Sequence, residues 1–235
     1  MPLTKPITRP EKALVAAGAI ILLAVAPAPP VAGEGSSVSR ARAGGDLRTI
    51  QLGPPDPADL AQGQLLIARR ELPDPNFVET VVLLIRYDES GAMGLIVNRP
   101  TETGLAALVP ELEETGARDA TVYAGGPVER DTLMMLVRSD ATPEESRAVS
   151  EDIYVSRSLA LLKRLSGDAA TRDDLRVYAG YAGWAPGQLA AEIERGDWYV
   201  IPADSEIVFD RRPLGLWPRL LPRDPDQVAR VLSRP

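Results

Sequence analysis

The 235-residue chain contains no cysteine and no histidine. The absence of cysteine excludes disulfide bonds, thiol catalysis and metal sites held by thiolates. The absence of histidine removes the commonest general base, and with it the usual Ser-His-Asp triad. Catalysis by Asp, Glu, Lys or Tyr stays open, as does an all-oxygen metal site. Together the two absences favour a protein that is not an enzyme.

The chain also has too little positive charge for broad contact with nucleic acid. It carries 26 Lys and Arg against 33 Asp and Glu, a formal net charge of −7, whereas phosphate backbones are bound by basic faces. The acidic residues show no spacing typical of a metal-binding loop. No Walker A or dinucleotide-binding motif is present. We therefore expect no metal, no cofactor and no direct binding to nucleic acid, and a partner that is an unidentified protein or small molecule.

The N-terminus has the pattern of a targeting segment. Three basic residues precede an apolar run at 13–26, and proline and small residues follow at 27–33. This order is typical of a secretory signal peptide, and the run is shorter than the ~18–20 residues of a membrane span. We expect residues 1–33 to be a signal peptide or an N-terminal membrane anchor, and the protein to be periplasmic or otherwise exported. Alternatives are a membrane contact through 13–26, or a cytoplasmic protein whose true start lies downstream.

A Gly/Ser-rich and then Pro-rich stretch at 34–59 follows, with little hydrophobic periodicity. Such composition is typical of a flexible tether. Apolar patterning begins near residue 60. We therefore expect one folded domain at 60–235.

Within this domain, strand-like and helix-like patterns do not alternate strictly, and neighbouring strands look antiparallel. Strands are expected at 64–68, 78–87, 92–98, 121–124, 133–137, 152–155 (an edge strand), 175–179, 198–201 and 207–209, and a weaker one at 47–52. Helices are expected at 103–114 with a break at Pro110, at 157–165 with Ser156 as its N-cap, at 186–195 and after Asp224. The pattern favours an α+β protein with a mixed, barrel-like β-sheet core and surrounding helices.

The segment YAGYAGWAPGQ at 178–188 places three glycines and three large aromatics in eleven residues. Glycine allows backbone angles or close approaches that a Cβ forbids. Gln188 and Glu192 are spaced to lie on one helix face, and Trp184 precedes a helix N-terminus, which favours anions. Tyr181, Trp184, Gln188 and Glu192 are therefore candidate ligand-binding residues. The alternative is structural, with Trp184 packed and Gln188 satisfying the helix start.

Two further pairs are candidates. Gly125 and Gly126 follow a strand, where their amides can hold a phosphate or where the chain can make a tight turn with positive φ. Asn98 and Arg99 close another strand, and Arg99 can bind a carboxylate or phosphate through two hydrogen bonds. The alternative for Arg99 is a surface arginine paired with Glu102.

Several of these segments, in this order and spacing, resemble the AlgH/YqgE family over residues 63 to about 210. They are Leu65–Ala68 with Asp74–Phe77, Gly91–Pro100, Gly125–Val128, and Gly180–Trp184 with Gly187–Leu189. The resemblance implies a compact α+β fold with a barrel-like core. Typical members carry histidines where this chain has Val137 and the segment 86–88. Members are labelled transcriptional regulators, but this chain has no helix-turn-helix signature.

These observations favour a non-enzymatic binding or interaction protein that is exported. One alternative is a transcriptional regulator, as the family label says, if the protein is cytoplasmic. The other is a hydrolase that uses carboxylates near the glycine-aromatic segment.

Overall fold

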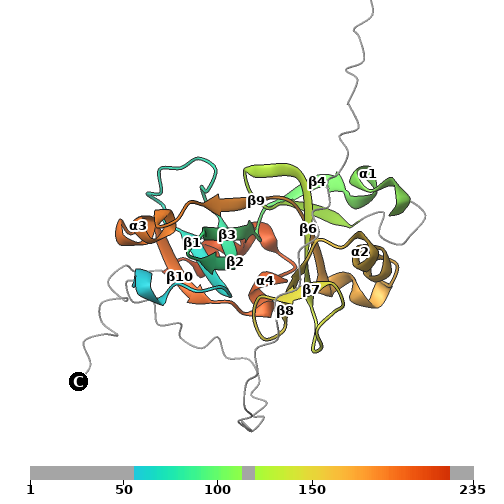
Figure 1. The fold of residues 1–235 in the computed structure, drawn as a ribbon. Helices are drawn as coiled ribbons and strands as arrows, with labels where there is room; N and C mark the ends of the chain where they lie inside the picture. Colours follow the sequence, from blue (N-terminus) through green and yellow to red (C-terminus); the bar gives the residue numbers. More distant parts are fainter. Residues whose placement is uncertain (1–55, 113–119, 223–235) are drawn as a thin grey trace, which may run out of the picture.

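The computed structural model describes residues 56–112 and 120–222. Ten strands in these ranges form one sheet, which curls into a half-barrel (Figure 1). The strands are β1 (Gln64–Ala68), β2 (Val81–Asp88), β3 (Gly91–Ile96), β4 (Pro100–Gly104), β5 (Thr121–Ala124), β6 (Val128–Arg138), β7 (Ser146–Ala148), β8 (Ile153–Ser156), β9 (Leu175–Trp184) and β10 (Trp198–Pro202). Their order is β10-β1-β2-β3-β9-β6-β8-β7, with β4 joined through β5 to β9.

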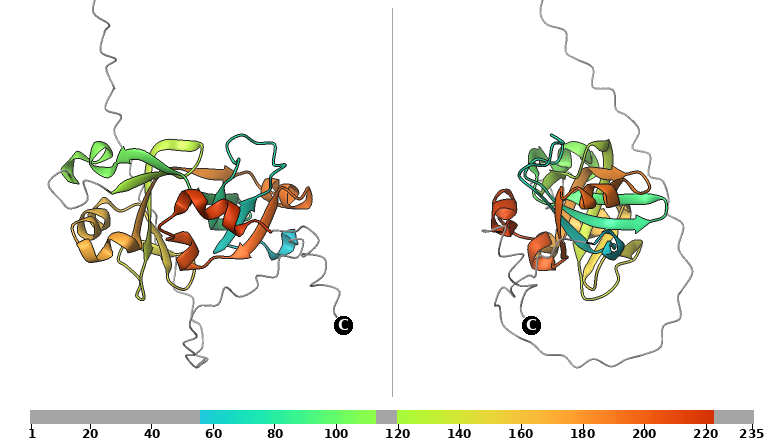
Figure 2. Two further views of the ribbon diagram at one scale, coloured as in Figure 1. Left: turned by 180° about the vertical axis from the view of Figure 1, so that it is seen from behind. Right: turned by 90° about the vertical axis from the view of Figure 1, so that its left-hand side faces the viewer.

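The described helices are short. They are α1 (Leu105–Leu108), α2 (Leu159–Ser166), α3 (Gln188–Glu194), α4 (Ser205–Val208) and α5 (Leu216–Leu220), with 3-10 turns η1 (Pro57–Asp59), η2 (Pro110–Leu112), η3 (Ala169–Asp174) and η4 (Pro213–Gly215). α1 and α2 lie at one end of the sheet and α3 at the other, while α4 and α5 cross one face (Figures 1 and 2). An α+β fold was predicted, but helices surrounding a barrel are not confirmed. None of the described helices has the length and apolar character needed to cross a bilayer.

Strand β9 holds the sheet together because it has different partners along its length. Its first part pairs in parallel with β5 and antiparallel with β6, so that Val177 lies opposite both Val122 and Met135. Its last part pairs antiparallel with β3, where Ala182 lies opposite Gly94. The glycine-aromatic segment was expected to follow a strand that ends at 179. Instead, the strand continues through the segment to Trp184.

The side chains of β9 contribute to different parts of the core, because Gly180, with a φ of 73°, interrupts the alternation of faces that a regular strand shows. Tyr178 is fully buried among residues of β1, β2, β3 and β6 on the inner side of the curl. Ala182 and Trp184 belong to a second cluster, together with Trp198 of β10. A third cluster packs α1 and α2 against β5, β6 and β8, with Val177 among its members.

Several expected elements differ in the structure. Residues 207–209 were expected to form a strand because they are β-branched or aromatic, yet α4 begins at Ser205. Its N-cap is Asp204, whose Oδ1 accepts a hydrogen bond from the Glu206 amide at 2.8 Å. Strand β8 was expected at an edge, but it lies between β6 and β7. β7 was not predicted.

The start of α2 also differs from the expectation. Its N-cap is Ser158, whose Oγ accepts from the Leu161 amide at 3.1 Å. Ser156, the expected cap, instead donates its hydroxyl to the carbonyl of Glu145 at 2.6 Å. The helix expected at 103–114 is interrupted near Pro110, as predicted, into α1 and η2. The expectations for residues 1–55 and for the helix after Asp224 lie outside the described residues.

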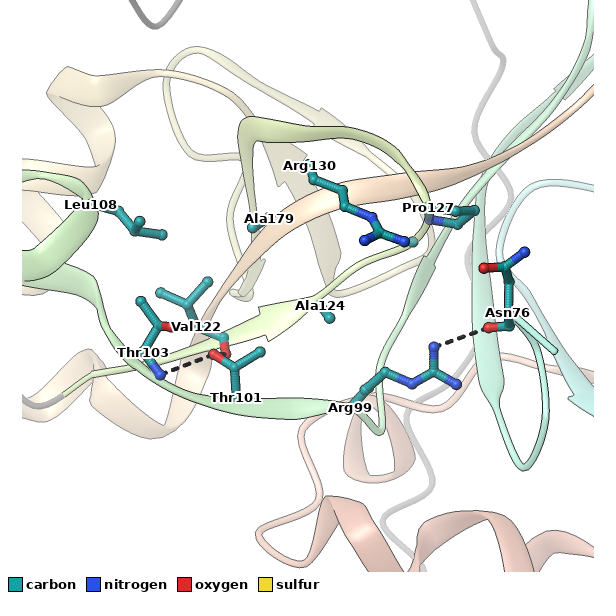
Figure 3. Close-up of a pocket in the computed structure, with 11 residues that line it drawn as sticks. Asn76, Arg99, Thr101, Thr103, Leu108, Val122, Ala124, Pro127, Arg130 and Ala179 are labelled. Carbon is teal, nitrogen blue, oxygen red and sulfur yellow. Dashed lines mark hydrogen bonds between the residues drawn. The ribbon is translucent and has the colours of Figure 1, made fainter. Parts of the chain in front are cut away.

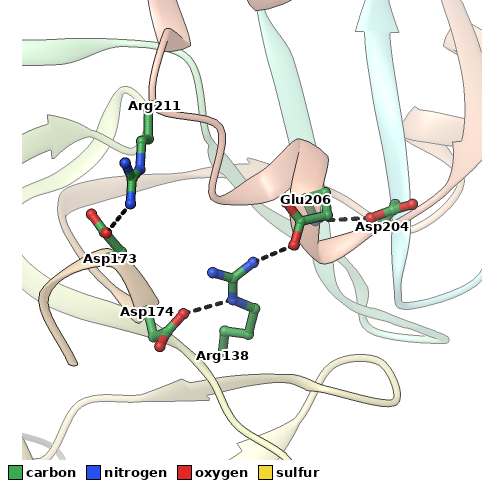
Figure 4. Close-up of polar contacts among 6 residues, drawn as sticks. All are labelled: Arg138, Asp173, Asp174, Asp204, Glu206 and Arg211. Atoms are coloured by element: carbon green, nitrogen blue, oxygen red, sulfur yellow. Dashed lines mark hydrogen bonds and ion pairs between the residues drawn. The ribbon is translucent and has the colours of Figure 1, made fainter. Parts of the chain in front are cut away.

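Arg138, at the end of β6, connects distant elements. Its Nε donates to Asp174 of η3 at 2.7 Å and one terminal nitrogen donates to Glu206 of α4 at 2.8 Å (Figure 4). Burial lowers the pKa of Arg138, but the carboxylates of Asp174, Glu206 and Asp152 together raise it by more, so the net shift is upward. Arg211 forms a second ion pair beside it with Asp173. These contacts fasten α4 to the end of β6.

Candidate functional site

The turn after β3 is fixed by a buried amide. Asn98 is only 7% exposed. Its Oδ1 accepts a hydrogen bond from the Val81 amide at 2.8 Å, and its Nδ2 donates to the carbonyl of Glu79 at 2.9 Å. Asn98 therefore ties this turn to the loop before β2 and sets the position of the residue that follows it.

That residue, Arg99, is half-buried and is anchored by backbone carbonyls. Its terminal nitrogens donate to Asn76 at 2.9 Å and to Val78 at 3.3 Å. A guanidinium has five N–H groups, so donors are left for another ligand. Burial lowers the pKa of Arg99 because it disfavours the charged form. An anion beside Arg99 would offset this cost.

Arg130 approaches the same region from β6. The register of β6 against β9 shifts between Val128 and Leu133, and Glu129 within this bulge has a φ of 43°. The Glu129 side chain points toward Arg157, and its Oε2 lies 3.7 Å from a terminal guanidinium nitrogen of Arg157. Arg130 points the other way, so that its guanidinium and that of Arg99 flank one hollow (Figure 3). Within residues 56–112 and 120–222, the side chain of Arg130 has no hydrogen bond or ion pair.

The hollow is a pocket of about 410 Å³, within the usual range for small-molecule sites. Its polar lining consists of Asn76, Arg99, Thr101, Thr103 and Arg130. Its apolar or small lining consists of Leu108, Val122, Ala124, Gly126, Pro127 and Ala179. The lining contains two arginines and no carboxylate, although the whole chain carries a net charge of −7.

The floor of the pocket depends on a close crossing of two backbones. Gly125 donates to the carbonyl of Ala179 at 2.9 Å and accepts from Ile96 at 2.9 Å. A Cβ on Gly125 or Gly126 would overlap the backbone of β9. Neither of these two glycines has a positive φ, so the proposed tight turn with positive φ is wrong and close approach is the reason for glycine. Because the Gly125 amide bonds within the sheet, it is not free for a phosphate.

A second group of predicted residues forms an aromatic cluster at α3. Glu192 Oε2 accepts from the indole Nε1 of Trp184 at 2.9 Å and of Trp198 at 3.0 Å. Gln188 donates its amide to Glu192 Oε1 at 3.0 Å and accepts from the Ala185 amide at 3.1 Å. Gln188 and Glu192 therefore share a helix face, as expected. These hydrogen bonds give both of them a structural role.

Phe77 connects this cluster to the pocket. Its ring stacks on Trp184 at 5.6 Å between centroids and meets the edge of Trp198 at 5.5 Å. The preceding residue, Asn76, lines the pocket and accepts from Arg99. The aromatic cluster thus anchors the loop that forms one wall of the pocket.

The structure separates the candidates into three places. Arg99 and Gly126 line the pocket, with Asn98 and Gly125 beside them. Trp184, Gln188 and Glu192 form the aromatic cluster. Tyr181 lies on the other face of β9, because it is an odd number of residues from Trp184. Its hydroxyl contacts Glu129 at 3.3 Å, and burial, with help from this carboxylate, raises its pKa.

Sequence reasoning missed four polar residues of the pocket, namely Asn76, Thr101, Thr103 and Arg130. Asn76 lies in one of the segments that carry the family resemblance, which was a usable signal. Arg130 shows no signal in the sequence, since only the bulge in β6 directs it to the pocket. Thr101 and Thr103 lie in β4. No strand was predicted there, and residue 103 was assigned to the start of a helix.

Comparison with known proteins agrees with this architecture. A family model described as AlgH-like matches residues 65–227. A UPF0301 protein of Thermobifida fusca is 38% identical over 183 residues, covering 74% of this chain and 91% of that protein. A UPF0301 protein of Mycobacterium tuberculosis H37Rv is 34% identical over 179 residues, covering 74% and 87%.

Two solved structures share the fold. The solution structure of the AlgH protein of Pseudomonas aeruginosa has a TM-score of 0.57 at 26% identity, covering 82% of this chain and 98% of that one. A crystal structure of a Corynebacterium diphtheriae protein has a TM-score of 0.60 at 24% identity, covering 72% and 90%. The second likeness concerns the fold alone.

Proposed function

The chain belongs to the AlgH-like family, and we propose that it is a binding protein, not an enzyme, whose pocket takes an anionic group. One observation carries this proposal. Arg99 and Arg130 flank a pocket of about 410 Å³ that no carboxylate lines. A carboxylate or phosphate is the natural partner for two such guanidinium groups.

The inventory of the pocket supports binding over catalysis. Its hydroxyl groups belong to Thr101 and Thr103, and Thr101 donates to the carbonyl of Val122 at 2.7 Å. The lining offers hydrogen-bond donors but no Asp, Glu, Lys or Tyr that would serve as general base. Glu192, the carboxylate on which the hydrolase alternative depends, accepts hydrogen bonds from two indoles and an amide in the aromatic cluster.

The test is calorimetric titration of the full chain with acetate, hexanoate and inorganic phosphate. We expect binding of at least one of them at millimolar or lower concentration. Arg130→Gln should weaken it at least about fivefold, because a hydrogen bond to a charged group contributes about 1.5–3 kcal/mol. Arg212→Gln is the matched control, since Arg212 is exposed and lies outside the pocket. No binding, or equal affinity in Arg130→Gln, would overturn the proposal.

Export is a separate proposal, supported by the basic and apolar pattern at 1–33. Cell fractionation with N-terminal sequencing tests it. A periplasmic product that starts near residue 33 is expected. A cytosolic product that starts near residue 60 would contradict it and would favour the family's intracellular label instead. A gel shift at low salt, where electrostatic binding is strongest, tests the further expectation that the protein does not bind DNA.

A further inference from the structure

The pocket has a cationic end and an apolar end. Figure 3 shows Arg99, Arg130 and Asn76 together on one side and Leu108 on the opposite side. Between them lies a floor of small side chains from β5 and β9, including Ala124 and Ala179. The charge and the apolar surface are therefore separated along the pocket.

This separation follows from the strands that build the floor. β4, β5 and β9 lie side by side, and Ala124 is in register with Ala179. Small residues on adjacent strands keep the floor low, so that a ligand can lie across it. Leu108, on α1, forms a wall of the hollow at the end away from the arginines. Only one end of the pocket offers charge to a ligand.

We propose that the ligand is a small amphipathic anion, in which one carboxylate or phosphate is joined to an apolar body. The proposal rests on the anion-binding function proposed above. The acidic group lies between Arg99 and Arg130, and the apolar body extends over Ala124 and Ala179 toward Leu108. A bare inorganic anion fills only the cationic end and leaves the apolar end in contact with water.

Calorimetric titration of the full chain with acetate, butanoate, hexanoate and neutral 1-hexanol tests this. Each methylene that is fully buried should raise affinity by up to about fourfold, so hexanoate should bind at least about tenfold more tightly than acetate. Hexanol, which lacks the charge, should bind more weakly than hexanoate. Arg130→Gln should weaken all the acids by a similar factor.

Two variants of the apolar end make the test specific. Leu108→Ser should reduce the gain in affinity from acetate to hexanoate and leave the affinity for acetate unchanged. Leu214→Ser, at an exposed leucine outside the pocket, should behave as wild type. Thr103→Val, a change of nearly equal volume at an exposed position of β4, should increase the gain in affinity from acetate to hexanoate. This second variant tests the apolar end even if Leu108→Ser fails to fold.

The outcomes separate the two proposals. If acetate, butanoate and hexanoate bind with equal affinity and Arg130→Gln lowers the affinity for all three, the anion-binding function stands and the amphipathic ligand is rejected. If hexanol binds as tightly as hexanoate, or if no acid binds, the anion-binding function fails and this inference fails with it.

Discussion

Gly126 lies against the peptide group of Tyr181 so closely that a methyl group on Gly126 would overlap the Tyr181 carbonyl. The contact is part of the crossing of the 125–127 turn over β9. It places Gly126 and Pro127 in the pocket lining while Tyr181 faces the other side of the sheet. The strand that forms the floor and the turn that forms the wall therefore cannot move independently.

We expect Gly126→Ala to destabilise the protein by about 1–3 kcal/mol, because an inserted methyl group in a packed region forces the backbone apart. Gly167→Ala is the control. Gly167 has ordinary α-helical angles, and a Cβ there would meet nothing closer than 3.6 Å. Urea denaturation of both variants makes the comparison. Equal stability of the two would show that the crossing tolerates a side chain.

Glu192→Ala should destabilise by about 2–4 kcal/mol, since the indoles of Trp184 and Trp198 both lose their acceptor and each is at most 5% exposed. Glu194→Ala on the same helix is the control, because Glu194 is exposed. Its change should stay within about 0.5 kcal/mol. Tryptophan fluorescence during urea unfolding reports both. A loss for Glu192→Ala no larger than the control would mean that the indoles find other partners.

Tyr178→Phe should stabilise the protein by about 1 kcal/mol at neutral pH. Tyr178 is fully buried, and in the described part of the chain its hydroxyl has no hydrogen-bond partner. Phenylalanine fills the same space without a polar atom to desolvate. Tyr87→Phe, at a half-buried position, is the control for loss of one hydroxyl. A destabilised Tyr178→Phe would indicate that a bound water satisfies the hydroxyl.

Tyr178 should also make the stability of the protein depend on pH. Burial raises the pKa of Tyr178 strongly, and the nearby Arg176 lowers it by less. In the unfolded chain a tyrosine releases its proton near pH 10, while the folded chain keeps it, so stability falls as the pH rises above about 10. Tyr178→Phe should lose less stability than wild type between neutral pH and about pH 10.5. Urea denaturation at the two pH values measures this loss. An equal loss of unfolding free energy in wild type and in Tyr178→Phe would contradict this assignment.

Local patterning predicted some elements closely. The apolar runs at 64–68 and 121–124 coincide with β1 and β5, because both are short, apolar and bounded by turn residues. The prediction of a strand at 207–209 was wrong because these three strand-favouring residues follow a strong helix N-cap, Asp204. The Asp204 side chain bonds the Glu206 amide, so local capping decided the structure there and propensity did not.

The pocket itself was only partly predictable. Arg99 was identified because a polar pair closes an apolar strand. Arg130 reaches the same hollow only through the bulge at Glu129 and the pairing of β6 with β9, which join residues about fifty positions apart in the chain. Gln188 and Glu192 were correctly placed on one face, but nothing local showed that Trp198 would share the Glu192 carboxylate.

The position of β9 in the chain has a consequence for biosynthesis. β3, β5 and β6 are all made before residue 175, and each of them uses β9 as a neighbour. As the chain leaves the ribosome from its N-terminus, these three strands expose unpaired edges until Trp184 has emerged. Unpaired edges are where chains associate wrongly. Ribosome stalling or truncation ahead of this strand should therefore release aggregation-prone fragments, whereas chains extended past it should not.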